Sequence, residues 1–308
     1  MTKSPSSSTP ASSSVLTVCA PAKINLVLRI LDRRPDGYHN LWSVMQTVGL
    51  EDEVTIRLVP ERAGIVLRCD EHTLKADQTN LVYRAAAAVL DRAGQQIGLD
   101  VALTKRIPMG AGLGGGSSDA AATIVGLNRL LGLQWSAAQM AEVSQSLGSD
   151  VPFFFHAPCA IVSGRGEQVS KVDLTGSRWV VLVNPGFGVE TKWAYQHLSA
   201  TRAAVRPIED SYRSMEQAGP LAWDRILAAA HNDFEPPVFE AHPTLREIKR
   251  QLLVHGAEAA LLSGSGATVF GVFPDESKAQ AVHAVFKADP TLKVFTVSAG
   301  SGPLAWRA

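Results

Sequence analysis

A glycine-rich segment is the first place in this sequence where residue types and spacing point to chemistry. Residues 108–121 read PMGAGLGGGSSDAA, with five glycines within seven residues, followed by two serines and an acid. Glycine costs conformational entropy in an ordered structure, so such a cluster indicates close approach of a ligand, a left-handed turn or a flexible linker. The strand-like GLDVALTKRIP precedes it and the helical pattern SSDAAATIVGLNRLLGL follows it, which argues against a linker.

A strand, a glycine loop and a helix N-terminus in this order can form an anion site. Unpaired backbone N–H groups and the positive end of the helix dipole meet at that point. We expect Ser117 or Ser118 to cap the helix and Asp119 to lie in its first turn, where an acid suits the dipole. The leading interpretation is a phosphate-binding loop, and the alternative is a glycine loop that serves packing alone.

Three well-known phosphate loops fit this segment poorly. The GxxxxGK[ST] pattern needs a lysine before the serine, whereas a glycine precedes Ser117 here. The dinucleotide pattern GxGxxG matches at Gly110, Gly112 and Gly115. A Rossmann unit also needs an acid at the end of a strand about 20 residues later, but residues 130–142 are helical in pattern. The HRD and DFG signatures of protein kinases are absent from the sequence.

A lysine and an aspartate outside this segment could take part in group transfer. Lys23, in PAKIN, is flanked by apolar residues on an expected strand, and Asp150, in GSDVPFF, precedes an apolar run. From the residues alone, Lys23 could instead extend its ammonium into solvent from an edge strand, and Asp150 could be a cap or turn residue. Asn25 is two residues from Lys23, so the two side chains share one face of a strand.

Two further motifs allow both a functional and a structural interpretation. DGYHNL, residues 36–41, places Tyr38 beside His39 in a turn, which fits either a binding site or a surface turn with a packed tyrosine. LLSGSGATVF, residues 261–270, fits either a ligand contact or a tight connection between a helix and a strand. The remaining histidines lack the HExxH type of spacing that is typical of metal sites.

Strand and helix patterns divide the chain into two parts, separated by a turn-rich segment over 163–179. Capping signals mark two of the helices of the first part: Asn80 and Gly94 bound one, and a Ser136–Gln139 capping box with Gly148 bounds the other. The second part alternates strands with helices, which indicates an α+β domain. In the first part, strands are expected over 15–31, 41–59, 64–69 and 98–108, and helices over 80–94, 117–133 and 136–148. In the second part, strands are expected over 179–185, 266–273 and 293–299, and helices over 191–198, 245–255 and 276–288.

Composition limits the class of protein. The 308 residues are 46% apolar, which is enough for a sizeable core, and 29 basic side chains balance 29 acidic ones. This neutral balance argues against nucleic acid as the main partner. Three cysteines without a CxxC pair favour a reducing compartment, and no apolar run reaches the roughly 18–20 residues of a membrane span. Residues 1–15 are rich in serine and proline and lack a signal-peptide h-region, so we expect a disordered tail on a cytoplasmic protein.

The glycine-rich segment resembles the PxGxGLGSSAA loop of the GHMP kinases. Other segments resemble one family of that superfamily, the 4-diphosphocytidyl-2-C-methyl-D-erythritol kinases, in the same order from about residue 18 to residue 270. These segments are PAKINLVLRI, RRPDGYHNL, KRIPMGAGLGGGSSDAA, LGSDVPFF and LLSGSGATVF. Three consecutive glycines, Gly114 to Gly116, are typical of this branch. The residues alone support only an ATP-dependent phosphotransferase.

The resemblance implies transfer of the γ-phosphate of ATP, with Mg²⁺, to the 2-hydroxyl of the cytidyl substrate in non-mevalonate isoprenoid synthesis. It makes Asp150 the general base, with Lys23 beside it, and the glycine loop the site of the ATP phosphates. That loop comprises Pro108, Met109, Gly110, Ala111, Gly112, Leu113, Gly114, Gly115, Gly116, Ser117 and Ser118. No dedicated metal ligands are assigned, because Mg²⁺ binds mainly through substrate phosphates and water.

Further contacts are implied by the same resemblance. Asn80 and Lys105 match positions near the adenosine pocket, and Asn25 matches a substrate contact. Tyr38 would stack on cytosine and His39 would hydrogen-bond the polar edge of the base. In a looser alignment, Thr191 matches a substrate contact and Tyr195 stands where a second stacking aromatic, commonly phenylalanine, is found.

The implied architecture is the α+β two-domain GHMP kinase fold. It combines a ribosomal-protein-S5-domain-2-like N-terminal domain, over 16–170, with a ferredoxin-like C-terminal domain, over 171–308. The expected partner is a small cytidyl-diphosphate compound, with neither nucleic acid nor membrane, and the sequence leaves monomer and homodimer open. Three rivals remain: a homoserine or mevalonate kinase of the same superfamily, a nucleic-acid-binding protein, and a nicotinamide oxidoreductase suggested by the GxGxxG match.

Overall fold

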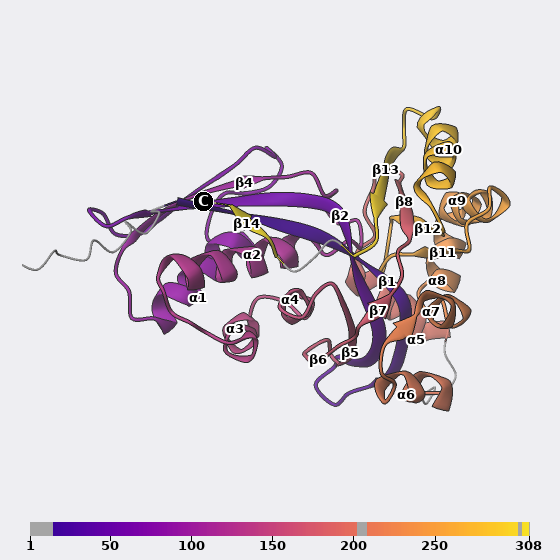
Figure 1. The fold of residues 1–308 in the computed structure, drawn as a ribbon, viewed down its shortest axis with the longest axis horizontal. Coiled ribbons are helices and arrows are strands. Elements are labelled where there is room, and N and C mark those ends of the chain that lie inside the picture. Colours follow the sequence, from indigo (N-terminus) through magenta and orange to yellow (C-terminus); the bar gives the residue numbers. More distant parts are fainter. Residues whose placement is uncertain (1–14, 202–207, 301–303, 308) are drawn as a thin grey trace, which may run out of the picture.

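The computed structural model of this protein describes residues 15–201, 208–300 and 304–307. The expected tail over 1–15 lies outside these residues except for Val15, which begins the first strand. No helix within the described residues is long and apolar enough to span a bilayer. Two sheets with their own helices lie end to end, and a long hairpin of the first sheet reaches toward the second (Figure 1).

The N-terminal sheet is built around the hairpin of β1 (Val15–Arg33) and β2 (His39–Val59). Both strands are long, and β2 changes partner along its length: residues 53–59 pair with β4 (Gly98–Thr104), whereas residues 41–46 pair with β5 (Cys159–Gly164). The register between β1 and β2 shifts at Pro21/Ala22 and again between Asn25 and Val27. Such irregularities bend a strand and redirect its side chains, and here they flank Lys23.

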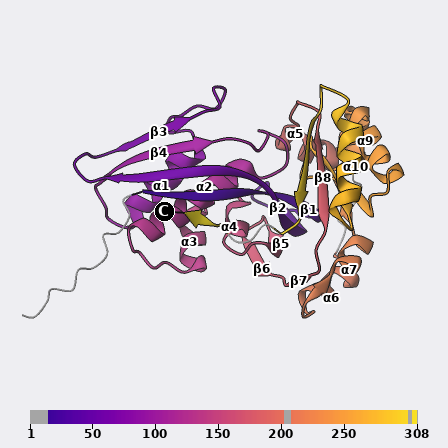
Figure 2. The ribbon, with the colours of Figure 1, turned by 45° about the horizontal axis from the view of Figure 1, so that its top comes forward.

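The remaining strands of the first sheet extend it on both sides (Figure 2). Next to β4 lies β3 (Ile65–Cys69), and next to β5 lies β6 (Gln168–Lys171). Two short strands from the second half of the chain, β10 (His231–Asn232) and β14 (Trp306–Arg307), pair with β1. The N-terminal sheet therefore contains residues from beyond the boundary expected near 170.

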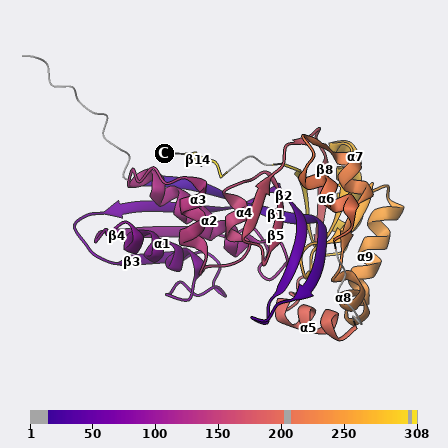
Figure 3. The same cartoon turned by 90° about the horizontal axis from the view of Figure 1, so that it is seen from below.

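Four helices belong to the N-terminal part and lie on one face of its sheet (Figure 3). They are α1 (Leu81–Arg92), α2 (Gly115–Leu130), α3 (Ala137–Ser144) and α4 (Val151–Phe154). The side chain of Asn80 caps α1, and Ser136 and Gln139 form a reciprocal capping box on α3, which confirms both expected caps. The expectation that Gly148 ends the third helix is wrong: α3 ends at Ser144, and the N–H of Leu147 then bonds the Ser144 carbonyl in a turn that buries the leucine.

The C-terminal sheet confirms the expected ferredoxin-like arrangement. Its strands lie in the antiparallel order β11-β12-β8-β13, and α9 and α10 provide the two crossover connections. The elements are β8 (Trp179–Asn184), α9 (Pro243–Val254), β11 (Ala259–Leu262), β12 (Val269–Phe273), α10 (Glu276–Lys287) and β13 (Lys293–Ser298). Between β8 and α9 the chain adds α5 (Thr191–Thr201), α6 (Asp210–Glu216), α7 (Trp223–Ala228) and α8 (Glu235–Ala241). A small two-stranded sheet joins β7 (Leu174–Thr175) to β9 (Leu221–Ala222).

The two sheets share a hydrophobic core, which fixes their relative position. Val48 and Leu50 of β2 belong to the same buried cluster as Val180, Phe270 and Val297 of the C-terminal sheet. Apolar surface removed from water stabilises by roughly 25 cal/mol per Å², so this shared cluster resists separation of the domains. Side chains contributed by both domains are therefore held at defined distances.

Candidate active site

The glycine-rich loop of residues 108–116 joins the end of the β4 segment to α2. Gly110, Gly112 and Gly114 have φ of +61°, +76° and +70°, a region that side-chain-bearing residues rarely occupy. Helix α2 begins at Gly115, and Gly114 is its N-cap without any side-chain cap. The expected cap by Ser117 or Ser118 is therefore wrong, because the helix starts two residues earlier than the serine pattern suggests. Asp119 correspondingly lies beyond the first turn.

The loop forms one wall of a cavity of about 630 Å³. Of the expected phosphate-loop residues, Ser118 is the exception that does not line this cavity, because its side chain is fully buried. The lining from the loop comprises Pro108, Met109, Gly110, Ala111, Gly112, Leu113, Gly114, Gly115, Gly116 and Ser117. Lys23, Asn25, Asn80, Lys105, Asp150, Thr191 and Tyr195 line the same cavity. Backbone N–H groups at the start of α2 thus adjoin a space large enough for a nucleotide-sized ligand.

Lys23 and Asp150 meet at this cavity. The Lys23 ammonium lies 3.5 Å from Asp150 Oδ2, and the exposed fractions of the two side chains are 4% and 33%. Lys23 Nζ also donates to Asn25 Oδ1 at 2.7 Å, and Asn25 in turn donates to Ser43 Oγ at 2.9 Å. The alternative of an edge-strand lysine extended into solvent is wrong, and the shared strand face of Lys23 and Asn25 is confirmed. The carboxylate, unlike the ammonium, is accessible to a ligand.

The second glycine turn, residues 263–266, packs directly on the first. Ser263 Oγ donates to the Gly112 carbonyl at 2.9 Å, and the Thr268 N–H donates to the Ala111 carbonyl at 3.2 Å. A Cβ at Gly112 would lie 2.0 Å from the Ser263 carbonyl oxygen, so the close approach requires glycine at this position. Gly264, Ser265 and Gly266 line the cavity. The C-terminal domain therefore completes the cavity that the N-terminal loop begins.

A second cavity, of about 680 Å³, adjoins the first. Four residues line both cavities: Leu41, Asp150, Thr191 and Tyr195. Apart from Gly37, the remaining lining of the second cavity is polar or aromatic; it comprises Arg33, Gly37, Tyr38, His39, Ser149, Arg165, Lys192, Gln196 and Ser199. Asp150 thus stands where the two cavities meet.

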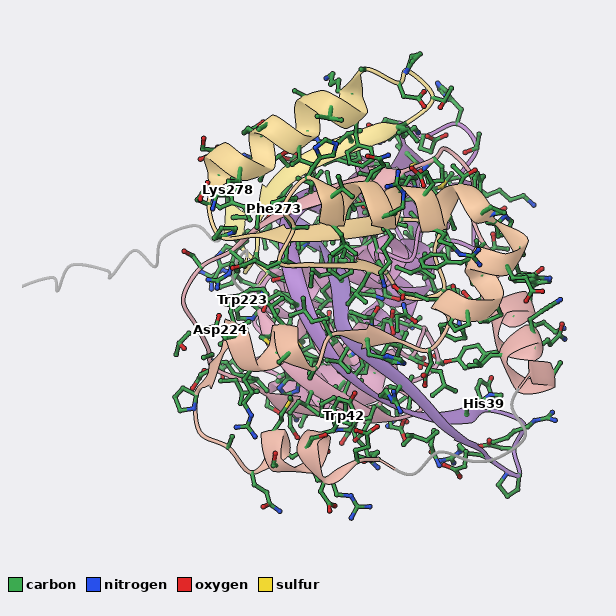
Figure 4. All side chains as sticks on the ribbon, turned by 90° about the vertical axis from the view of Figure 1, so that its right-hand side faces the viewer. His39, Trp42, Trp223, Asp224, Phe273 and Lys278 are labelled. Carbon is green, nitrogen blue, oxygen red and sulfur yellow. The ribbon has the colours of Figure 1, made fainter. Side chains whose placement is uncertain are left out.

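Aromatic side chains gather in the second cavity. The ring of His39, on the hairpin end of β2 (Figure 4), stacks on Tyr195 with centroids 5.0 Å apart and planes inclined by 22°. His39 Nε2 also lies 3.1 Å from Ser199 Oγ. Burial, together with the Asp150 charge, raises the pKa of Tyr195, so its phenol stays neutral. Tyr38 is 58% exposed, and the Arg165 guanidinium lies 5.3 Å from its ring centroid.

Asn80 and Lys105 lie in the first cavity but have protein partners already. The Asn80 amide caps α1 by accepting from the Val82 N–H and donates to the Lys75 carbonyl. The Lys105 ammonium is held between Asp52 and Asp119, with a distance of 2.7 Å to Asp119 Oδ2. Burial works to lower the pKa of Lys105, but these two carboxylates raise it above its usual value. Lys105 is therefore a cation whose charge is neutralised within the protein.

The structure brings two sets of residues to the site that sequence reasoning missed. Arg165 and Lys192 supply positive charge to the second cavity. The segment around Arg165 was expected to be a domain boundary because of its turn residues, but it is the connection between β5 and β6. Asn232, at β10, donates to the carbonyls of Leu262 and Gly264 and so holds the second glycine turn. The run HNDFEP around Asn232 is a polar interruption that could have signalled this role.

The site offers a metal ion few protein ligands. Within residues 15–201, 208–300 and 304–307, no three His, Cys, Asp or Glu side chains are grouped so that they could hold a metal by themselves. A partly exposed Asp150, which lines the same cavity as the glycine-rich loop, fits an ion such as Mg²⁺, which keeps waters and binds through phosphates with few protein ligands.

Comparison with known families and sequences gives a consistent result. The GHMP kinases N terminal domain matches residues 80–157, and the GHMP kinases C terminal domain matches residues 220–290. A 4-diphosphocytidyl-2-C-methyl-D-erythritol kinase of Syntrophotalea carbinolica is 46% identical over 262 residues, which cover 85% of this chain and 91% of the relative. A kinase of the same name from Syntrophus aciditrophicus is 41% identical and covers 92% of this chain and 99% of its own.

Solved structures agree in fold. A crystal structure of 4-(cytidine 5'-diphospho)-2C-methyl-D-erythritol kinase superposes with a TM-score of 0.74 at 31% identity, covering 93% of this chain and all of the other. A homoserine kinase from Cytophaga hutchinsonii superposes with a TM-score of 0.75 at 18% identity, covering 97% and 99% of the two chains. The latter likeness shows the fold alone.

Proposed function

This chain belongs to the 4-diphosphocytidyl-2-C-methyl-D-erythritol kinase family of the GHMP kinases, and we propose that it phosphorylates the 2-hydroxyl of that cytidyl compound with ATP, a step of non-mevalonate isoprenoid synthesis. The observation that carries this proposal is the position of Asp150. Its carboxylate lines both the cavity of the glycine loop and the cavity of Tyr38 and His39. A hydroxyl held at this junction would meet the end of a triphosphate held by the loop.

The glycine loop would bind the ATP phosphates. The left-handed glycines expose backbone N–H groups, and the start of α2 adds the positive end of a helix dipole. Fixed dipoles of this kind cost no reorganisation during reaction, so they stabilise charge efficiently in a site that excludes water. Asn80 and the apolar residues Leu74, Leu81 and Ile107, which line the same cavity, would face the adenosine.

Asp150 would act as the general base. Its carboxylate would accept the proton of the substrate hydroxyl while the oxygen attacks the γ-phosphorus, and the Lys23 ammonium 3.5 Å away would stabilise the negative charge that develops. Asn25, whose side chain is fixed between Lys23 and Ser43, would help to orient the hydroxyl. Positioning and charge neutralisation supply most of the rate in phosphoryl transfer, so these fixed distances matter more than base strength.

Mg²⁺ bound to the phosphates would neutralise charge on the transferred group, and the Asp150 carboxylate, which lines the same cavity as the loop, would hold it directly or through one of its waters. The second cavity would hold the cytidyl diphosphate. Tyr38, His39 and Tyr195 offer aromatic faces for the base, and Arg165 and Lys192 offer charges that complement a diphosphate. Thr191, whose hydroxyl lies 3.1 Å from Ser265 Oγ, would contact the substrate between the two cavities.

The test is an ADP-release assay with Mg-ATP and three acceptor alcohols: 4-diphosphocytidyl-2-C-methyl-D-erythritol, homoserine and mevalonate. Turnover with the cytidyl compound alone is expected. Release of ADP only with one of the other alcohols would overturn the proposed substrate but leave the proposed kinase activity intact. Absence of ADP release with all three, from protein shown to be folded, would contradict the proposal as a whole.

A further inference from the structure

Three buried charged side chains lie beneath the phosphate loop. Asp52 comes from β2, Lys105 follows β4, and Asp119 lies in α2, and their exposed fractions are 0%, 6% and 2%. The Lys105 ammonium donates to Asp52 Oδ2 and, at 2.7 Å, to Asp119 Oδ2. These side chains, named here the loop-base cluster, join three elements that are far apart in the sequence.

The loop-base cluster contacts the loop at both ends. Asp52 Oδ1 accepts the backbone N–H groups of Arg106 at 2.5 Å and Ile107 at 2.9 Å, directly before the loop begins. Asp119 follows directly after the loop serines, so its bond to Lys105 fixes the other end. Both ends are thereby attached to β2, a strand in the interior of the sheet.

The backbone of the loop at Gly115 also packs against the loop-base cluster. A Cβ at Gly115 would lie 3.3 Å from Lys105 Nζ and 3.1 Å from Ile107 Cγ2. Helix α2 begins at Gly115, so the Gly115 N–H is one of the backbone groups at the helix N-terminus that have no partner within the helix. A shift of the Lys105 ammonium would therefore move the group of N–H donors that bind phosphate.

The charges of the cluster are balanced. Burial raises the pKa of Asp119 to about 8, and the Asp52 carboxylate adds to this shift while Lys105 opposes it. The Lys105 ammonium lies between the two acidic groups, so its positive charge is compensated inside the cluster. Two other titratable groups adjoin the cluster: Asp70, whose Oδ1 accepts the Lys105 backbone N–H, and Cys69, a thiol whose pKa burial raises.

We propose that Asp52, Lys105 and Asp119 are positioning residues that set nucleotide affinity by holding both ends of the phosphate loop. This inference rests on the proposed function. It adds a supporting role to Lys105, which lines the nucleotide cavity and whose ammonium also donates to Asp52 and Asp119. Charge-assisted hydrogen bonds are about twice as strong as neutral ones, so they suit a fixed support.

The test compares ADP binding, by calorimetry with Mg²⁺, and steady-state kinetics among variants. Asp52→Asn keeps the shape of the side chain but removes the charge that holds Lys105. We expect the Kd for ADP and the KM for ATP to rise about tenfold or more, while the KM for the cytidyl acceptor and kcat at saturating ATP change by less than about threefold.

The matched control is Asp100→Asn, which removes a carboxylate from an ion pair with Arg62, 2.8 Å apart, on the same strand β4 and outside both cavities. It should leave the Kd for ADP unchanged. A folded Asp52→Asn protein with wild-type ADP affinity would overturn the inference. If Asp52→Asn does not fold, Asp119→Ala provides the test, because it removes only the hydrogen bond between Lys105 and α2. The proposal then requires that Asp119→Ala weakens ADP binding more than acceptor binding. Wild-type protein that fails to bind ADP would instead refute the proposed function.

Discussion

The hydroxyl of Ser263 donates a hydrogen bond of 2.9 Å to the carbonyl of Gly112, and so joins the glycine turn of the C-terminal domain to the glycine-rich loop of the N-terminal domain. The approach is close enough that a Cβ at Gly112 would lie 2.0 Å from the Ser263 carbonyl oxygen. One loop therefore supports the other, and the first cavity depends on both domains. This relationship and the Lys23–Asp150 pair lead to the following predictions.

Gly112→Ala should displace one loop from the other. A left-handed conformation costs a non-glycine residue roughly 1–2 kcal/mol, and the clash with Ser263 adds to it. Because misplacement by about 1 Å can cost 100-fold in rate, kcat/KM for ATP should fall by about that factor. Gly132→Ala is the matched control: its φ is +63° but nothing lies within 4 Å of the added Cβ. Gly132→Ala should lower the stability of the protein but not kcat/KM for ATP. Equal losses of kcat/KM in the two variants would contradict the clash.

Asp150→Asn should lower kcat by about 10²–10⁴, because an amide cannot accept the hydroxyl proton. The Asp150 side chain is one-third exposed and makes no cap hydrogen bond to α4, so the melting temperature and the affinity for ADP should stay near wild type. Single-turnover phosphoryl transfer measures the chemical step directly. If Asp150→Asn retains turnover within tenfold of the wild type, Asp150 is not the general base.

Lys23→Met and Lys23→Ala should differ in a way that separates charge from packing. The methylene stem of Lys23 packs on the loop, since a Cβ at Gly114 would lie 2.9 Å from Lys23 Cγ. Methionine keeps most of this stem, so Lys23→Met should lose kcat while the KM for ATP stays near wild type. Lys23→Ala should lose kcat and also raise the KM for ATP. An equal KM in both variants would show that the stem does not support the loop.

Tyr38→Ala should raise the KM for the cytidyl acceptor by about tenfold or more, because stacking on a base contributes about 1–3 kcal/mol. The side chain is largely exposed, so neither the melting temperature nor the KM for ATP should change. Trp306→Ala is the control, since Trp306 is also a half-exposed ring beneath a guanidinium, that of Arg129 at 4.7 Å, but it lies on β14 and lines neither cavity. An unaltered acceptor KM in Tyr38→Ala would exclude stacking.

Asp119→Asn should change how stability depends on pH. Burial raises the pKa of Asp119 to about 8, so the folded state binds a proton that the unfolded state has released. This contribution is fully present below the unfolded pKa near 4 and is lost as the pH rises through about 8. The melting temperature of Asp119→Asn relative to wild type should therefore increase from pH 5 to about pH 8 and then level off. If the difference in melting temperature between Asp119→Asn and the wild type did not depend on pH, the raised pKa of Asp119 would be contradicted.

Local sequence patterns predicted the elements whose signals lie within a few residues. Asn80 caps α1 and the Ser136–Gln139 box caps α3, because both hydrogen-bond sets close within one turn of chain. The start of α2 was predicted incorrectly. The serine pattern suggested a cap at Ser117 or Ser118, but the helix begins earlier, at Gly115. In this arrangement Asp119 accepts a hydrogen bond from Lys105, which follows strand β4.

The sequence by itself determined the glycine loop, its position before a helix and the family resemblance that picked out Lys23 and Asp150. Only the tertiary structure decided that these two side chains meet 3.5 Å apart at the junction of two cavities. It also decided that Arg165, in a segment expected to be a domain boundary, lines the second cavity. The physical reason is that hairpin register, strand irregularities and a core shared by two sheets set these distances, and none of them is encoded in any single local pattern.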